Sequence, residues 1–261
     1  MNQKIIFFDI DGTLYTSKRT IPESTKKAID LCIKNGHIVM LCTGRNLSII
    51  PDSIRNMPFH GMIGGCGTYI SYQNQVLLDT ALTGNDCDIV LDALYRCHVP
   101  FFVENSDYAY YDETYVPETF TKAVATMNAS YKGRLRSTSE LPKRLSKITG
   151  YPETNADLEQ LSDVLSPYFT TIIHKEHSYM EMVLRGYSKG TGIETILNTL
   201  QIPKEHSYAF GDSNNDIEML DAVAHPMVMG NANETLKKRY PVTDSIFEDG
   251  IYHGLEKFGL I

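Results

Sequence analysis

The chain has 261 residues, of which 42% are hydrophobic and 21% are charged, and its formal net charge is −8. This length suits two domains, and so ordinary a composition excludes a disordered or fibrous protein. The acidic balance argues against a nucleic-acid groove or a membrane-surface patch as the main function, because both require a basic surface.

Cysteine usage and hydropathy set the expected compartment. Five cysteines, none of them in a C-x-x-C pair, indicate a reducing environment. No apolar run approaches membrane-spanning length, and no signal-peptide pattern precedes the first predicted strand. We therefore expect a cytoplasmic monomer that binds neither nucleic acid nor membranes.

The first predicted element is a buried strand that ends in two carboxylates. An apolar run at residues 5–8 is followed by Asp9, Asp11 and Gly12. Side chains alternate along a strand, so the two carboxylates point to the same side and raise each other's pKa unless they are neutralised. A hard divalent cation, of which Mg²⁺ fits best, is the natural neutraliser. The plainer alternative is that these aspartates only turn the chain as it leaves the strand.

A helix and a second strand follow. Thr20 and Glu23 have capping-box spacing before an apolar helical face, and Asn35-Gly36 ends that helix. Residues 37–42 are a second buried apolar run. The strand–helix–strand order predicts a parallel sheet, in which ligands bind beyond the carboxyl ends of the strands. Thr43, directly after the second run, is therefore expected beside the two aspartates.

The pattern changes after a further helix predicted at residues 46–57 and a hairpin near residues 68–78. Residues 82–184 mix amphipathic helices with paired strands, as in 101–111 and 169–184, which predicts an α+β unit. We therefore place one α/β core in two pieces, residues 1–81 and 185–261, interrupted by an inserted domain from 82 to 184.

The core pattern returns in the last part of the chain. Lys189 opens a predicted helix, and a strand at residues 208–210 ends in a polar loop, residues 211–216. Four strand or helix ends thus bring polar groups to one edge of the predicted sheet.

Four sequence pieces, taken together, resemble the motifs of the haloacid dehalogenase superfamily. They are Asp-Ile-Asp-Gly-Thr-Leu at 9–14, Thr-Gly-Arg at 43–45, Ser-Lys-Gly at 188–190 and Gly-Asp-Ser-Asn-Asn-Asp at 211–216. The large insert between the second and third pieces is similar to the cap of the Cof-type branch of sugar-phosphate phosphatases. The resemblance covers essentially the whole chain, and it implies a Rossmann-like parallel-sheet core with an inserted α+β cap domain.

The resemblance also assigns roles. It makes Asp9 the nucleophile that forms an aspartyl-phosphate and Asp11 the general acid and base. The metal ligands would be Asp9, the backbone carbonyl of Asp11, and Asp212, holding Mg²⁺. Lys189 would balance the negative charge on Asp9 and on the transferring phosphoryl group. The expected substrate contacts are Thr43, Gly44, Arg45 and Asn215. Asp216 would contact residues of the site rather than the substrate itself.

Each of these residues has a plainer interpretation. Thr43 could cap the next helix, and Lys189 could be a solvated surface lysine. Residues 212–216 could be only a helix N-terminus, which favours acidic side chains. Arg45 could form a surface salt bridge instead of meeting phosphate. The joint presence of all four pieces favours the site.

Two other features carry less weight. Cof-type proteins usually have an Asn-Gly pair after the third core strand, whereas this chain has Gly65-Cys66-Gly67, which puts substrate contacts there in doubt. His174 and His177 lie three apart in or beside a predicted strand, and that spacing puts them on opposite faces, which argues against a zinc site.

The predicted function is a Mg²⁺-dependent phosphatase acting on a small phosphomonoester. By the resemblance, sugar phosphates come first, and phosphorylated cofactors such as pyridoxal phosphate or a flavin mononucleotide are alternatives. A phosphomutase would share all four motifs. A receiver-type phospho-aspartate switch is a rival of another class, but its chain is about half this length and its acceptor aspartate follows a later strand. Asp11 favours turnover, because an acid–base partner lets the phospho-aspartate be hydrolysed.

Overall fold

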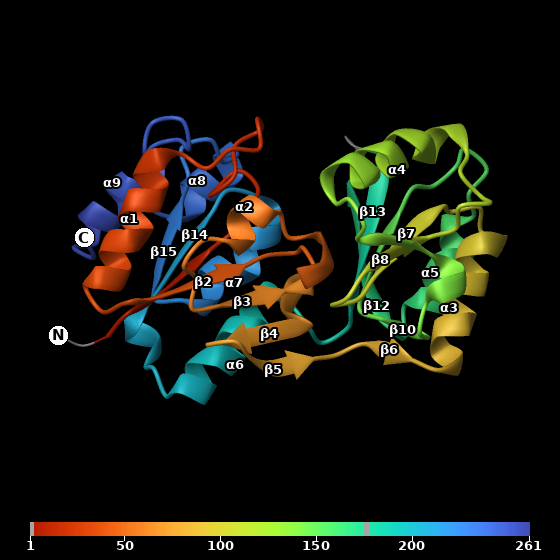
Figure 1. Cartoon of the computed structure of the whole chain (residues 1–261), viewed down its shortest axis with the longest axis horizontal. Coiled ribbons are helices and arrows are strands. Elements are labelled where there is room, and N and C mark those ends of the chain that lie inside the picture. The colour runs from red at the N-terminus through yellow and green to blue at the C-terminus, as the bar shows by residue number, and fades with distance from the viewer. Residues whose placement is uncertain (1–2, 175–177) are drawn as a thin grey trace. The chain divides into compact units, whose positions relative to one another are not determined.

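A computed structural model describes residues 3–174 and 178–261, and the chain forms two compact units (Figure 1). The core unit comprises Met1–Gly44, Asp52–Leu78 and Ser188–Ile261. The second unit comprises Arg45–Pro51 and Asp79–Tyr187. None of the helices within the described ranges is long and apolar enough to cross a membrane.

The core unit is built on a seven-stranded sheet of order β15-β14-β1-β2-β3-β4-β5. Its first five strands are parallel and the next is antiparallel to β3. The bounds are β1 (Ile5–Phe8), β2 (Ile38–Cys42), β3 (Gly61–Gly64), β4 (Tyr69–Tyr72), β5 (Gln75–Asp79), β14 (Ser207–Gly211) and β15 (His225–Val228). Phe8 of β1 lies opposite Leu41 of β2 and Phe210 of β14, so the segments that follow these three strands start side by side.

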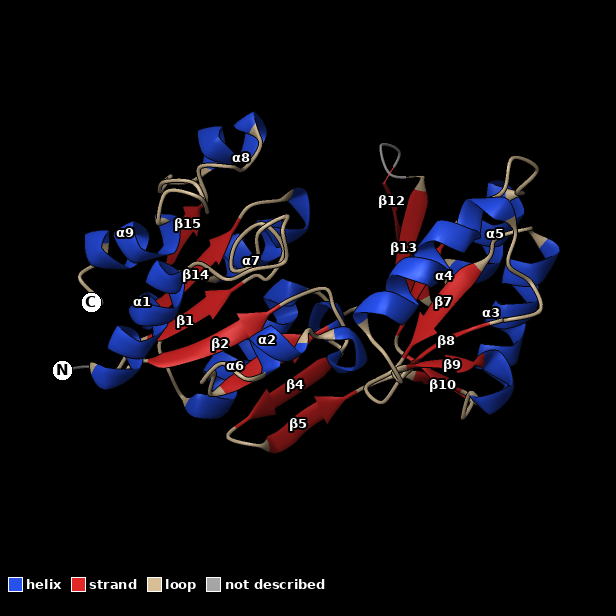
Figure 2. Ribbon diagram, turned by 45° about the horizontal axis from the view of Figure 1, so that its top comes forward, coloured by secondary structure: helices blue, strands red, loops and turns tan. Residues whose placement is uncertain are grey.

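Helices cover both faces of this sheet (Figure 2). Ile5 and Phe7 face a cluster that includes Ile193 and Met219, whereas Phe8 stacks on Phe210 on the opposite face, where α9 approaches Phe210. The helices are α1 (Glu23–Lys34), α2 (Asp52–Arg55), α6 (Lys189–Leu200), α7 (Ile217–Ala222), α8 (Glu234–Arg239) and α9 (Gly250–Lys257). A sheet buried on both faces explains why its central strands are continuous apolar runs.

The second unit has a six-stranded sheet of order β12-β13-β11-β7-β8-β9, in which only β8 and β9 pair in parallel. Apolar side chains of one face, such as Val103 and Met182, pack with residues of α3 and α5, and Phe102 on the other face packs on Phe120 of α4. A small ladder joins β6 to β10. The bounds are β6 (Leu82–Thr83), α3 (Asn85–Arg96), β7 (Phe101–Glu104), β8 (Ala109–Tyr111), α4 (Glu118–Ser130), β9 (Leu135–Ser137), β10 (Arg144–Leu145), β11 (Lys147–Gly150), α5 (Leu158–Leu165), β12 (Phe169–His174) and β13 (Tyr179–Leu184).

The predicted fold class, a parallel-sheet α/β core with an α+β unit, is confirmed, but three local predictions differ from the structure. The helix expected at residues 46–57 is a 3₁₀ turn, Leu47–Ile49, followed by the short α2, because Pro51 interrupts it. The capping box expected at Thr20 and Glu23 does not form, since Pro22 is the N-cap and the Thr20 hydroxyl bonds to Thr16.

The third difference concerns Arg45–Pro51, which the sequence places in the core but which the structure groups with the second unit. The physical reason is a set of buried hydrogen bonds from Asn46 and Ser48 to residues of that unit. Of the two histidines weighed above, His174 ends β12 and bonds to Glu181, and His177 lies outside the described residues.

Candidate active site

Lys189 joins two carboxylates at the carboxyl edge of the core sheet. Asp9 follows β1 directly, and Lys189 is the first residue of α6, whose N-cap Ser188 forms a capping box with Thr191. The Lys189 ammonium donates to Oδ1 of Asp9 and to Oδ1 of Asp216, each at 2.6 Å. None of the three side chains is more than 6% exposed. The interpretation of Lys189 as a solvated lysine is therefore wrong.

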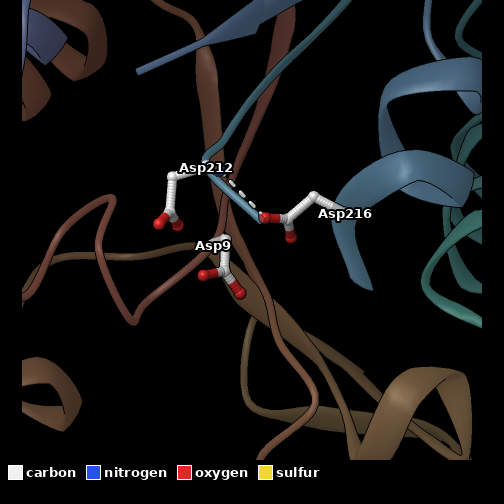
Figure 3. A group of neighbouring side chains, drawn as sticks. All are labelled: Asp9, Asp212 and Asp216. Carbon is white, nitrogen blue, oxygen red and sulfur yellow. Dashed lines mark hydrogen bonds between the residues drawn. The ribbon is translucent and has the colours of Figure 1, made fainter. Parts of the chain in front are cut away.

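Asp216 also shapes the loop that carries Asp212. Its Oδ2 accepts hydrogen bonds from the backbone amides of Asp212 at 2.9 Å and Ser213 at 3.0 Å. The Thr13 hydroxyl lies 3.2 Å from Oδ1 of Asp212 and donates to it. As Figure 3 shows, the three aspartates converge, Asp9 from the end of β1, Asp212 from the end of β14 and Asp216 from the start of α7. Two segments about two hundred residues apart in sequence thus meet because their strands are neighbours.

This arrangement carries more negative than positive charge. Burial raises the pKa of Asp9 well above its usual range, with the Asp216 carboxylate adding to the shift and Lys189 opposing it. Burial likewise raises the pKa of Asp212 to about 7, again with Asp216 adding to it. Burial disfavours the Lys189 ammonium, but attraction to Asp216 and Asp9 outweighs it and holds the Lys189 pKa well above its usual range. The Lys189 ammonium therefore bonds to two of these three carboxyl groups and acts on Asp212 through its charge alone.

The donor set fits a hard divalent cation. One carboxylate oxygen from each of Asp9, Asp212 and Asp216 lies within 4.8 Å of the others. Oxygen donors with excess negative charge are what Mg²⁺ requires. Both oxygens of Asp216 are already used by Lys189 and by backbone amides, so Asp9 and Asp212 are the side chains that suit the ligand role.

The turn after β1 brings a glycine against Asp212. Gly12 has φ +83°, and a Cβ built on it would lie 2.1 Å from Oδ2 of Asp212. Its amide donates to the Tyr15 carbonyl at 3.0 Å, and its carbonyl accepts from the Asn231 amide group at 2.9 Å. Asp11, one residue earlier, is exposed, in contrast to the buried Asp9. The two aspartates that the sequence pairs therefore have opposite environments.

Thr43 follows β2 directly and is fixed within the core unit. Its amide donates to the Ile63 carbonyl at 2.9 Å, and its carbonyl accepts from the Cys66 amide at 3.2 Å. Thr43 is 1% exposed. It is not a helix cap, because the next helical turn has Asn46 as its N-cap. Gly44 is the last residue of this stretch of the core unit.

Two predicted substrate contacts have partners of their own. Arg45 belongs to the second unit, where its guanidinium donates to the Ile49 carbonyl at 3.3 Å and to the Tyr131 hydroxyl. Asn215 is exposed, and its side-chain oxygen accepts from the Ser213 hydroxyl at 2.6 Å. Arg45 therefore fits the expected contact with substrate less well than Asn215, which is an exposed residue of the Asp212–Asp216 loop.

Two residues that the sequence did not single out lie at the site: Thr13 donates to Asp212, and Asn231 donates to the Gly12 carbonyl. Thr13 lies within the first motif, and a hydroxyl next to a carboxylate pair was an available signal. Asn231 follows β15, so its position after another strand of the same sheet was a second signal.

Comparison with known proteins identifies the family. The model of the haloacid dehalogenase-like hydrolases matches residues 6–255. YkrA of Bacillus subtilis (strain 168), which carries a provisional phosphatase name, is 28% identical, with both chains covered completely. The HMP-PP phosphatase of Yersinia enterocolitica is 26% identical over 97% of this chain and 94% of that protein. The solved structure of BT4131, described as a HAD subclass IIB sugar phosphatase, aligns with a TM-score of 0.81 and 26% identity over 99% of this chain and all of that one.

The chain therefore belongs to the haloacid dehalogenase-like hydrolases. The prediction of a Cof-type phosphatase of this superfamily, which is a phosphoric monoester hydrolase, is confirmed.

Proposed function

We propose that this protein hydrolyses small phosphomonoesters, sugar phosphates first, through a phosphoryl group carried on Asp9. The observation that supports this best is the buried Lys189 ammonium, which bonds to Asp9 and Asp216 beside Asp212. The cytoplasmic location and the monomeric state expected from the sequence remain part of this proposal.

The reaction has two displacement steps. In the first, a carboxylate oxygen of Asp9 attacks phosphorus, the ester P–O bond breaks, and the leaving alkoxide takes a proton from Asp11. In the second, Asp11 removes a proton from water, whose oxygen attacks phosphorus and releases inorganic phosphate and free Asp9. The exposed position of Asp11 suits a group that must reach both the leaving alcohol and water.

Fixed charges around Asp9 support these steps. Lys189 stabilises the ionised nucleophile and the negative charge of the transferring group, and Asp216 holds the ammonium in place. A Mg²⁺ ion held by Asp9, Asp212 and the Asp11 carbonyl would withdraw charge from the phosphate oxygens. We propose that the Thr43 hydroxyl and the Gly44 amide donate to the phosphate, and that Asn215 contacts the substrate. Arg45 is the weakest member of the predicted set, because its guanidinium has partners in the second unit.

The choice of substrate class rests on relatives. BT4131 is described as a sugar phosphatase, and the Yersinia relative as an HMP-PP phosphatase, so relatives of similar identity are named for different substrates. We place sugar phosphates first because the structure of BT4131 aligns over 99% of this chain with 26% sequence identity. Phosphorylated cofactors come second.

The test is phosphate release from a panel of sugar phosphates and phosphorylated cofactors, with Mg²⁺ and with a chelator. We expect turnover that the chelator abolishes. Asp9→Asn should remove turnover completely, whereas Asp11→Asn should retain Mg²⁺ binding and lose most turnover. A near-normal rate in Asp9→Asn would sink the covalent mechanism. A rate that depends on an added sugar bisphosphate would indicate a mutase, and a long-lived phosphoprotein would indicate the switch.

A further inference from the structure

The segment that follows β15 is bonded to both parts of the chain that carry the site's aspartates. It comprises residues 229–233, Met-Gly-Asn-Ala-Asn, and connects β15 to α8. The Met229 amide donates to the Gly211 carbonyl at 3.0 Å, so the segment is bonded to the end of β14, one residue before Asp212. All of these residues belong to the core unit.

Asn231 lies in this segment and uses both ends of its side-chain amide. Its Nδ2 donates to the Gly12 carbonyl at 2.9 Å, and its Oδ1 accepts from the Ile246 amide at 2.9 Å. The adjacent Gly230 amide bonds to the same loop, residues 244–246, at 3.0 Å. Asn231 is therefore held by one loop of the core unit while it holds the turn after β1.

The bond from Asn231 fixes a peptide unit whose two residues both lie against Asp212. The Gly12 carbonyl and the Thr13 amide belong to one planar unit, and the bond from that amide to the Ile10 carbonyl is long, at 3.4 Å. A Cβ on Gly12 would lie 2.1 Å from Oδ2 of Asp212, and the Thr13 hydroxyl donates to Oδ1 at 3.2 Å. The 2.9 Å bond from Asn231 is thus the shorter of the two that hold this Gly12–Thr13 peptide unit against the Asp212 carboxylate.

These contacts close a ring within the core unit. Its members, in order, are Asp212, Thr13, Gly12, Asn231, Gly230, Met229 and Gly211, the last of which precedes Asp212 in the chain. In a closed ring, displacement of the turn from Asp212 is resisted from both sides. Asp9 and Asp212 are both acidic, so a frame that holds them close before a cation arrives lowers the free-energy cost of binding it.

We propose that Asn231 is a positioning residue for Asp212: it holds the Gly12–Thr13 peptide unit against the Asp212 carboxylate and so raises the site's affinity for a divalent cation. This inference rests on the proposed function for the identity of the cation, Mg²⁺. It assigns to an exposed asparagine after β15 an effect that is exerted through Gly12 and Thr13.

The test measures Mn²⁺ affinity of the full chain and its variants by electron paramagnetic resonance, which reports free Mn²⁺. Mn²⁺ alone is the probe, because it takes the same oxygen ligands as Mg²⁺. Asn231→Ala should weaken Mn²⁺ binding about fivefold, the effect of one net hydrogen bond. Thr13→Val, which removes the hydroxyl that bonds to Asp212, should weaken it at least as much. The double variant should lose less than the product of the two single effects, because both changes act on one carboxylate.

Asn231→Asp separates the two bonds of this side chain. It keeps an oxygen that accepts from the Ile246 amide, but it has no donor for the Gly12 carbonyl, and it adds a negative charge. We expect Mn²⁺ binding as weak as in Asn231→Ala, because the Gly12–Thr13 peptide unit has lost its bond. An affinity equal to or above that of the natural chain would overturn the inference, since charge or the bond to Ile246 would then explain the role of Asn231.

The matched control is Ile29→Val. Ile29 is fully buried in α1, outside the ring, so its truncation destabilises the core unit by an amount comparable to the loss of one hydrogen bond. It should lower the Tm and leave Mn²⁺ affinity unchanged. Equal affinity in Asn231→Ala and the natural chain would overturn the inference, and so would an equal loss in Ile29→Val, since either result leaves Asn231 with a structural role only. A natural chain that binds no Mn²⁺ would overturn it as well.

Turnover gives a second readout that a merely structural role would not change. In Asn231→Ala, the Mg²⁺ concentration for half-maximal phosphate release should rise about fivefold, while kcat at saturating Mg²⁺ should change by less than about twofold. A lower kcat with an unchanged Mg²⁺ requirement would contradict positioning of the ligand. Mn²⁺ binding is measured without substrate, so a natural chain that binds Mn²⁺ but hydrolyses no ester would count against the proposed function alone.

Discussion

Lys189→Met tests the electrostatics of the candidate site most directly. Methionine keeps the approximate length and apolar stem of lysine but removes the ammonium that bonds to Asp9 and Asp216 at 2.6 Å. Both carboxyl groups are at most 6% exposed, so neither gains water as a replacement partner. Removing one member of such a buried set costs about 3–5 kcal/mol, out of a typical total of roughly 5–15 kcal/mol.

The assay is urea unfolding followed by far-UV circular dichroism, because the chain has no tryptophan. The control is Lys26→Met, since Lys26 is an exposed lysine of α1 and its loss should change the unfolding free energy by less than about 0.5 kcal/mol. Added Mg²⁺ should recover part of the stability lost in Lys189→Met by supplying positive charge. If Lys189→Met lost no more stability than Lys26→Met, Asp9 and Asp216 would have to be hydrated or protonated, and a buried ammonium that stabilises two carboxylates would be refuted.

Three further outcomes are expected. Gly12→Ala should abolish most turnover and cost about 1–2 kcal/mol of stability, because a Cβ would meet Asp212 and φ is +83°; normal kcat with an unchanged Tm would contradict this. In the second unit, the Lys147 ammonium, with His174 adding, overcomes the effect of burial and lowers the pKa of Glu181 from 4.5 to about 2. That depressed pKa contributes up to about 3 kcal/mol above pH 4.5, lost as pH falls toward 2, so urea unfolding should show Glu181→Gln less stable than the natural chain at pH 7 and nearly equal to it near pH 2. Mg²⁺ should raise the Tm of the natural chain by relieving repulsion among the clustered carboxylates; a Tm unaffected by Mg²⁺ or chelator would count against the metal site.

Local sequence was sufficient to predict where the candidate site lies. Asp9, Asp11, Thr43, Lys189 and Asp212 are all recognisable because each follows an apolar run or opens a helix. Parallel strands place such ends at one edge of a sheet whatever the rest of the chain does. The core and the α+β character of the second unit could be predicted for a similar reason, since hydrophobic periodicity reports which faces are buried.

Tertiary structure decided how those residues interact. That β14 pairs with β1, so that Lys189 bonds to Asp9 and to Asp216, depends on strand order, which no local pattern specifies. The opposite environments of Asp9 and Asp11 arise because Asp9 is buried at the end of β1, whereas Asp11 lies on the exposed turn that follows.

The segment after Thr43 shows the same division. Its sequence predicts a helix of the core, yet Asn46 and Ser48 satisfy their hydrogen bonds with Glu104 and Asn105, more than fifty residues away. Pairing of buried polar groups is settled by which partners long-range packing brings within reach. The sequence by itself therefore indicated which chemical groups lie at the ends of strands and helices, and the tertiary structure alone decided which of them are held together and by what.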